Sequence, residues 1–170
     1  MSSEISLHPL AEFPEQAKIP LQWSIDLWGE GKPEFSTEDW RIFYDHALKG
    51  NYESWDPKGA DQELIYLAMR DYKVVGAIAL CDFDDLEEFR NLKPWIAAFI
   101  VDPNLRGSGL GSAILKLMEA KVIAFGIKTI YLWSENRNDF YKNRGYLSID
   151  RLHKSGLSER EIVIYRKALG

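Results

Sequence analysis

Runs of apolar residues along the chain predict a series of β-strands. Residues 64–69 and 74–81 are two apolar runs rich in branched and aromatic side chains, separated by the polar residues 70–73, which predicts a β-hairpin. The continuous apolar segment 95–101 is typical of a strand buried on both faces, at the centre of a sheet. Further strands are predicted at residues 5–10, 129–133, 146–152 and 162–165, the last two as a second hairpin.

Apolar residues spaced three and four apart predict helices between these strands. Ile114, Met118 and Val122 define such a spacing within residues 112–125, and Gly126 supplies the stop. Ser36 and Asp39 have the spacing of a capping box before a helix that reaches Leu48. Other helical segments are predicted at residues 12–28, interrupted at Pro14 and Pro20, and at residues 139–144, closed by Gly145.

The order of these elements predicts one α/β domain over residues 1–170. A strand at 95–101, a helix at 112–125 and a strand at 129–133 form a crossover of the parallel type, whereas the hairpins are antiparallel. We therefore expect a mixed sheet of six to seven strands flanked by about four helices. No internal repeat or linker-like tract divides the chain, which supports a single domain.

Composition narrows the class of protein. The net charge of −5 argues against nucleic acid and is compatible with a cationic partner. No apolar run approaches the length of a membrane span, and the first residues do not resemble a secretion signal. Cys81 is the single cysteine, so neither an internal disulfide nor a cysteine-based zinc site is expected. These features predict a cytoplasmic protein without a metal.

A glycine-rich segment joins the central strand to the predicted helix. Arg106 precedes Gly107, Gly109 and Gly111, which alternate with other residues. Unpaired N–H groups at a helix N-terminus attract anions, and glycines remove the Cβ atoms that would hold a phosphate away. The spacing fits neither the dinucleotide fingerprint nor the P-loop. We interpret the segment as a phosphate site; the alternative is that the glycines only permit a tight turn.

These motifs resemble those of the GNAT N-acetyltransferase superfamily. Arg106, Gly109 and Gly111 match its Q/R-x-x-G-x-G/A signature, and Val101-Asp102-Pro103 precedes them as in many members. Residues 140–146 resemble the family segment F-Y-x-x-x-G-F/Y, and the likeness is closest between residues 94 and 149. The resemblance implies the GNAT fold and acetyl-CoA as cosubstrate, with no metal.

The resemblance also implies roles for individual residues. The tyrosine hydroxyl of the second motif, here Tyr141, faces the CoA sulfur, so Tyr141 is the candidate general acid for the departing thiolate. The backbone of Phe99, Ile100 and Val101 would pair with the pantetheine arm. Ser134 stands where many members carry an asparagine that helps to hold that arm. The remaining cofactor-binding residues implied are Arg106, Gly107, Ser108, Gly109, Leu110, Gly111, Ser112 and Phe140.

The general base and the acceptor site are less defined by sequence. Trp95 occupies the strand position where some family members carry a catalytic glutamate, so that role does not transfer. Asp85 and Glu135 are candidate general bases, although an acidic run is usually a solvated loop. The candidate acceptor-binding residues are Trp23, Trp28, Trp55, Asp82 and Asp84, the tryptophans having core packing as their alternative role.

The reaction expected is direct transfer of an acetyl group from CoA to a primary amine, within a ternary complex and without an acyl-enzyme. A small-molecule amine, cationic in character, is the leading acceptor. The alternatives are acetylation of a peptide or protein, and a non-catalytic CoA-binding regulatory module. Either a monomer or a homodimer is compatible with the sequence.

Overall fold

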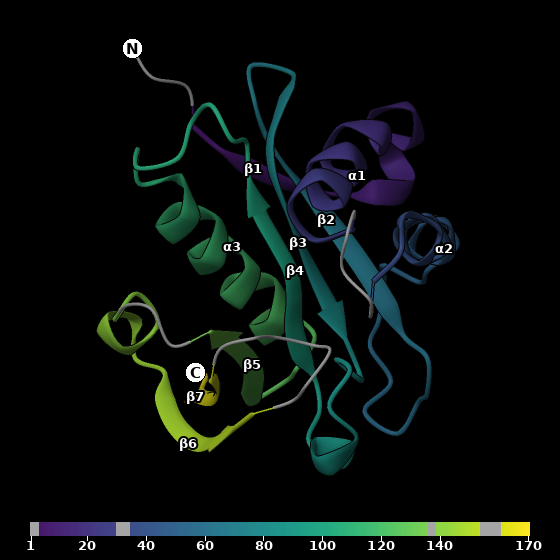
Figure 1. Ribbon diagram of the computed structural model, residues 1–170. Helices are drawn as coiled ribbons and strands as arrows, with labels where there is room; N and C mark the ends of the chain where they lie inside the picture. The colour runs from purple at the N-terminus through teal and green to yellow at the C-terminus, as the bar shows by residue number, and fades with distance from the viewer. Residues whose placement is uncertain (1–3, 30–34, 136–138, 154–160) are drawn as a thin grey trace.

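The computed structural model describes residues 4–29, 35–135, 139–153 and 161–170. It confirms a mixed α/β fold, with one seven-stranded sheet in the order β1-β2-β3-β4-β5-β7-β6 (Figure 1). The strands are β1 (Ser6–Pro9), β2 (Glu63–Arg70), β3 (Lys73–Cys81), β4 (Trp95–Val101), β5 (Thr129–Glu135), β6 (Leu147–Leu152) and β7 (Ile162–Ala168). The α-helices of the described residues are α1 (Lys18–Ser24), α2 (Thr37–Leu48) and α3 (Leu110–Ala124).

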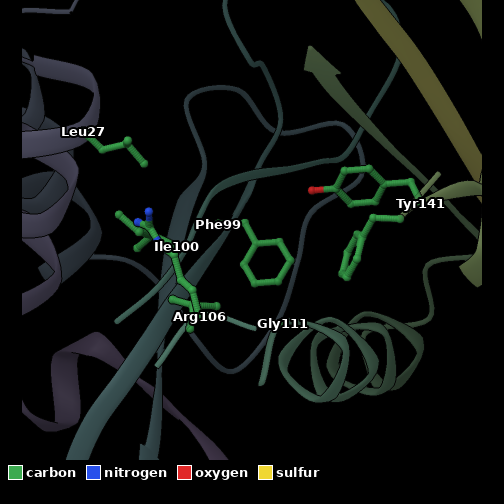
Figure 2. Close-up of a pocket in the computed structure, with 8 residues that line it drawn as sticks. Leu27, Phe99, Ile100, Arg106, Gly111 and Tyr141 are labelled. Atoms are coloured by element: carbon green, nitrogen blue, oxygen red, sulfur yellow. The ribbon is translucent and has the colours of Figure 1, made fainter. Parts of the chain in front are cut away.

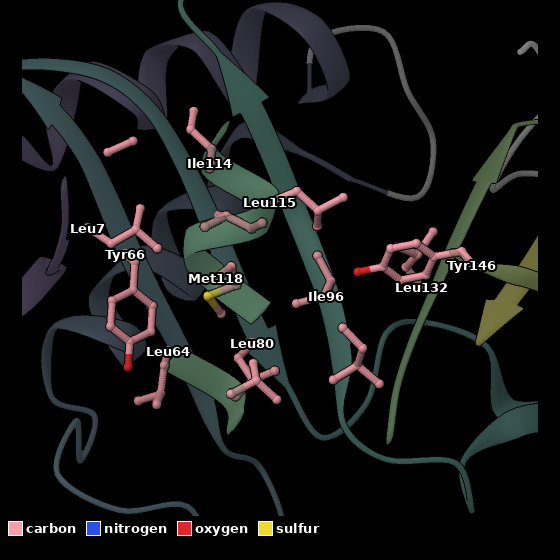
Figure 3. Packing of buried hydrophobic residues seen from close by; sticks show 14 of the residues in the cluster. Leu7, Leu64, Tyr66, Leu80, Ile96, Ile114, Leu115, Met118, Leu132 and Tyr146 are labelled. Carbon is pink, nitrogen blue, oxygen red and sulfur yellow. The ribbon is translucent and has the colours of Figure 1, made fainter. Parts of the chain in front are cut away.

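Helices cover both faces of the sheet. Figure 1 shows α3 on one face and α1 with α2 on the other. The predicted apolar stripe of α3 is confirmed, because Ile114, Met118 and Val122 are fully buried against the strands (Figure 3). On the opposite face, Tyr44 and Ala47 of α2 enter a second core. No helix in the described part of the chain is long and apolar enough to cross a membrane.

Local chemistry explains several element boundaries. Ser36 and Asp39 form the expected capping box at the start of α2. The β2–β3 hairpin turns through Asp71 and Tyr72, which have φ values of 53° and 65°. A two-residue loop needs positive φ at both positions to match the right-handed twist of the two strands. The expected interruption of the helix at Pro20 is wrong. Pro20 lies in the first turn of α1, where a missing N–H costs nothing.

Short helical turns replace some of the longer helices expected. Before α1 come two 3-10 turns, η1 (Leu10–Glu12) and η2 (Pro14–Gln16), and after it a π-helical turn, η3 (Ile25–Gly29). Another 3-10 turn, η4 (Glu87–Phe89), lies in the loop between β3 and β4, which is rich in acidic residues and is called the acidic loop below. The predicted helix at 139–144 is reduced to η5 (Lys142–Arg144), closed by Gly145 with φ 90°.

The two parallel strands at the centre of the sheet separate along their length. Among their described residues, only Trp95 of β4 and Tyr131 of β5 are in register. Between the β3 partners Ala77 and Ala79, β4 advances from Ile100 to Ala97, an extra residue that marks a bulge, and Ala98 has φ 46°. The bulge bends β4 away from β5 and opens the sheet beyond the paired ends.

Candidate active site

A cavity of about 280 Å³ lies at the carboxyl end of β4, where the bulge has opened the sheet. Its walls come from η3, the end of β4, the start of α3 and the segment before η5 (Figure 2). The lining residues are Leu27, Phe99, Ile100, Val101, Arg106, Gly111, Phe140 and Tyr141. Residues from the predicted cofactor strand, the glycine loop and the tyrosine motif thus meet in one cavity.

The glycine loop, residues 106–111, leads into the first turn of α3 and leaves open space beside its backbone. Gly107 and Gly109 have φ values of 81° and 84°, and Gly109 is the N-cap of α3 without a side-chain cap. A Cβ atom at either glycine would meet nothing within 4 Å. The N–H groups of Leu110, Gly111 and Ser112 open the helix, where no preceding helical carbonyl can accept from them. The glycines therefore serve the turn, and they also leave space in front of a helix end that attracts anions.

Tyr141 lies in an aromatic cluster at the edge of the cavity. Its ring centre is 5.0 Å from that of Phe140, 5.6 Å from that of Tyr165 and 5.7 Å from that of Tyr146. Figure 2 shows its hydroxyl on the side of the ring that faces Phe99. Burial, with a smaller effect from Tyr165, raises the pKa of Tyr141 to about 12. The phenol is therefore protonated at neutral pH and can donate a proton or a hydrogen bond.

Trp95 is a core residue. Its indole is buried beneath the loop between β3 and β4 and donates a hydrogen bond to the carbonyl of Leu92 at 2.7 Å. The same apolar cluster contains Leu86 from that loop and Ile164 from β7. This position therefore supplies packing and no proton acceptor, which agrees with the sequence argument that a glutamate role does not transfer to it.

The acidic loop between β3 and β4 is partly built into the fold. Asp82 is buried and accepts hydrogen bonds from the N–H groups of Asp61 at 3.1 Å and Gln62 at 2.8 Å. The indole N–H of Trp133 donates to the carbonyl of Asp84 at 3.0 Å. Burial of Asp84, followed by the charge of Asp85, raises the pKa of the Asp84 carboxyl well above its usual range. A negative charge on Asp85 therefore disfavours ionisation of Asp84.

The remaining residues predicted as base or acceptor ligands do not line the cavity. Glu135 ends β5, and its carbonyl accepts from the hydroxyl of Ser134 at 3.2 Å. Trp55 is buried in the core on the α3 face, and Trp23 packs beside the core on the opposite face. Trp28 stacks on Trp40 with ring centres 5.4 Å apart. Of the described residues predicted as base or acceptor ligands, none belongs to the cavity wall.

Leu27 is the wall residue that sequence reasoning missed. It is 42% exposed and projects from η3 on the side of the cavity opposite Tyr141 (Figure 2). The sequence favours its neighbour Trp28 because of the aromatic ring, but Leu27, in the π-helical turn, is the residue that lines the cavity. Helical spacing assumes a regular α-helix, so the sequence contained no signal for this rotation.

Comparison with known proteins identifies the family. The model of the acetyltransferase (GNAT) family matches residues 25–146, which include the cavity and its flanking elements. The chain belongs to the GNAT family, whose members carry out acyl transfer that depends on acetyl-CoA. None of the curated proteins matches this sequence as a relative.

Solved structures share the fold at low sequence identity. A GNAT-family protein from Desulfovibrio desulfuricans superposes with a TM-score of 0.69 at 17% identity, covering 98% of this chain and 100% of its own. A GNAT acetyltransferase from Elizabethkingia anophelis with acetyl-CoA bound gives 0.60 at 15%, covering 97% and 98%. The spermidine/spermine N-acetyltransferase SpeG from Vibrio cholerae, in mutant form, gives 0.65 at 12%, covering 97% and 95%.

Proposed function

We propose that this protein transfers the acetyl group of acetyl-CoA directly to a primary amine of a small molecule. The observation that carries the proposal is the cavity shared by the end of β4, the open start of α3 and the hydroxyl-bearing ring of Tyr141. A diphosphate at the N–H groups of Leu110, Gly111 and Ser112 and a pantetheine arm along the end of β4 would direct the thioester toward Tyr141.

Each group in the cavity then has a chemical role. The neutral amine attacks the thioester carbonyl, a C–N bond forms and the C–S bond breaks. Tyr141, which stays protonated at neutral pH, donates a hydrogen bond or its proton to the departing sulfur, and a phenolate formed in this way regains its proton from water. The proton of the ammonium goes to a carboxylate, directly or through water, and Asp85 and Glu135 remain the candidates. The carboxyl of Asp84, next to Asp85, has a pKa raised by burial and by the charge of Asp85.

The acceptor is proposed to be small and cationic. The net charge of −5 favours an amine that carries positive charge. Asp82 and Asp84 lie outside the cavity wall, and Asp82 already accepts two backbone hydrogen bonds, so neither is proposed as a direct ligand of that amine. A cavity of about 280 Å³ fits a small molecule with the end of a pantetheine arm. One structural neighbour is by name a spermidine/spermine N-acetyltransferase. A cytoplasmic location is proposed from the single cysteine, Cys81, and monomer and homodimer both remain compatible.

The test is release of the CoA thiol in the presence of a panel of amines. Polyamines, aminoglycosides, amino acids and peptides are offered with acetyl-CoA, and free thiol is measured with a chromogenic disulfide. Tyr141→Phe should lower kcat by about a hundredfold while the Kd of acetyl-CoA stays within a factor of about two. Tyr66→Phe, which removes a hydroxyl from a buried ring on β2, is the matched control and should keep wild-type kcat.

Two results would argue against the proposal. Tight acetyl-CoA binding with no thiol release for any amine would favour the non-catalytic CoA-binding module. Turnover with peptides alone would favour the peptide acetyltransferase. Equal kcat for wild type and Tyr141→Phe would remove Tyr141 from the mechanism but leave acetyl transfer standing.

A further inference from the structure

The segment that carries Tyr141 is attached to the first turn of α3 through Arg144. The guanidinium Nε donates to the hydroxyl of Ser112 at 3.0 Å, and Nη1 donates to the carbonyl of Phe140 at 2.8 Å. The guanidinium carbon also lies 3.8 Å from the centre of the Phe140 ring, which fixes the plane of the group. One side chain therefore joins the beginning of α3 to the residue that precedes Tyr141.

A second attachment lies two helical turns further along α3. Glu119 accepts a hydrogen bond from the hydroxyl of Tyr146 at 2.7 Å and forms an ion pair with Lys167 at 3.0 Å. Lys167 also donates to the carbonyl of Arg144 at 2.8 Å. Residues 112 and 119 share one face of the helix because about 3.6 residues make a turn. The Tyr141 segment, residues 140–146, therefore contacts the same face of α3 near both of its ends, through Arg144 at Ser112 and through Tyr146 at Glu119.

The two attachments have different consequences. The side chains of Glu119 and Lys167 are only 14% and 23% exposed, so this pair lies in the packed part of the molecule and loss of either member leaves a poorly solvated charge. Ser112 instead belongs to the first turn of α3, whose N–H groups are the proposed ligands of the CoA diphosphate. The hydrogen bond from Arg144 to Ser112 connects the proposed phosphate site to the Tyr141 segment.

We propose that Arg144 is a positioning residue for acetyl transfer. By bonding Ser112 and the carbonyl of Phe140, it fixes Tyr141 relative to the helix turn that holds the cofactor, and so sets the distance from the phenol to the leaving sulfur. The inference rests on the proposed function, since a thioester must lie in the cavity for this distance to matter. The planar fork of arginine suits the task, because it donates in two directions from one rigid plane, which a lysine cannot do.

The nearest competing role is direct binding of a CoA phosphate by the Arg144 charge. The two roles separate in steady-state and binding measurements. A phosphate ligand contributes to the Kd of CoA and to its salt dependence. A positioning residue contributes to kcat, because it affects a contact made as the thiolate departs.

The experiment compares three variants with a matched control. Arg144→Met removes the charge and both bonds, Arg144→Lys keeps the charge without the fork, and Ser112→Ala removes only the acceptor. The control is Arg151→Met, which removes an arginine on the edge strand β6 whose ion pair at 2.8 Å is with Glu161, the residue that precedes β7. For each protein, kcat is measured with the best amine of the panel, and the Kd of CoA is measured by calorimetry at two salt concentrations.

Arg144→Met should lower kcat by about ten- to a hundredfold, the range caused by displacing a reacting group by about 1 Å. Its Kd for CoA and the salt dependence of that Kd should match the control. Arg144→Lys should lose nearly as much kcat, and Ser112→Ala less. The double variant of Arg144→Met and Ser112→Ala should be no slower than Arg144→Met alone, since both remove one shared contact.

Other outcomes would overturn the assignment. A rise in Kd that matches the loss of kcat would make Arg144 a phosphate ligand. Unchanged kcat in Arg144→Met, or losses that add in the double variant, would leave Arg144 without a positioning role. If Arg144→Met does not unfold cooperatively, Ser112→Ala tests the positioning role instead. The role then requires that Ser112→Ala lowers kcat without changing the Kd of CoA.

A readout independent of turnover separates this inference from the proposed function. Proteins labelled with 3-fluorotyrosine are studied by ¹⁹F NMR, and the Tyr141 resonance is assigned with Tyr141→Phe. CoA should shift one sharp Tyr141 signal in wild type and in Arg151→Met, whereas in Arg144→Met the signal should be broadened or unresponsive. If wild type binds CoA but acetylates no amine, the proposed function fails, and this spectrum still tests the placement of Tyr141. A sharp Tyr141 signal that CoA shifts in Arg144→Met as it does in wild type would refute the positioning role of Arg144.

Discussion

Replacing Gly109 with alanine tests whether the space in front of α3 is a binding site. Gly109 has φ 84°, and a Cβ atom there would meet no protein atom within 4 Å. Gly126, just beyond the other end of α3, has φ 82° and is equally open, so Gly126→Ala is a matched control. In the free protein the two substitutions are therefore expected to have the same effect.

The magnitude follows from backbone strain. An alanine forced into the left-handed region costs about 1–2 kcal/mol. For a chain of this length, about 2–4 °C of Tm is lost per kcal/mol, so each variant should melt roughly 2–8 °C below wild type. Both melting temperatures can be measured by circular dichroism without ligand. This part of the prediction depends only on the conformation of the two glycines.

With CoA the two variants should diverge. A methyl group at Gly109 would occupy the space proposed for the diphosphate, so the Kd for CoA should rise by at least about tenfold, which corresponds to about 1.4 kcal/mol of lost contact. Gly126→Ala should keep the wild-type Kd in calorimetry. If both variants bind CoA as tightly as wild type, the glycines serve only the turn and the assignment of the phosphate site is wrong.

Three further predictions concern stability. Gly76→Ala should destabilise the fold by more than about 2 kcal/mol in chemical denaturation, because its Cβ would lie 2.6 Å from Ile114 Cδ1 and 2.9 Å from a backbone oxygen; a wild-type midpoint would contradict the packing described for α3. Asp84→Asn should raise Tm at pH 7.5, because the raised pKa of Asp84 makes its ionisation unfavourable in the folded state, and the gain should vanish near pH 3, where the carboxyl is protonated in both states; a lower Tm at pH 7.5 would show that the charge is stabilised. Ser36→Ala should cost about 1 kcal/mol through loss of the cap to Asp39, and an unchanged midpoint would mean that this helix end contributes nothing.

The parts predicted correctly are those governed by local chemistry. The spacing of Ile114, Met118 and Val122 reflects one buried face, so it predicted the orientation of α3. The capping box at Ser36 requires only two side chains close in sequence, and it was predicted for the same reason. The residue spacing around Tyr141 is characteristic of a family, and the structure places Tyr141 in the cavity wall, while its role as general acid stays a prediction.

The features missed depend on contacts between distant segments. Ala98 lies within a continuous apolar run, and nothing in that run indicates a positive φ or a bulge. The rotation of Leu27 into the cavity wall arises from a π-helical turn. Asp84 is partly buried because the acidic loop folds over Trp95 and its backbone contacts Trp133, and these residues are far apart in sequence. The sequence shows that this loop is polar. It does not show that the Asp82 carboxyl is buried and bonded to backbone N–H groups while Asp85 is exposed.

The bulge at Ala98 has a consequence for how the folded chain responds to its cosubstrate. In the described part of the chain β4 and β5 share a single aligned residue pair, so the edge of β4 that faces β5 is not paired with it beyond Trp95. An extended ligand lying in the gap would act as a missing strand, and saturation at a hundred times its Kd would add about 2.7 kcal/mol to the free energy of unfolding. Amide exchange at residues 99–101 should therefore slow more on ligand addition than exchange anywhere in the β2–β3 hairpin.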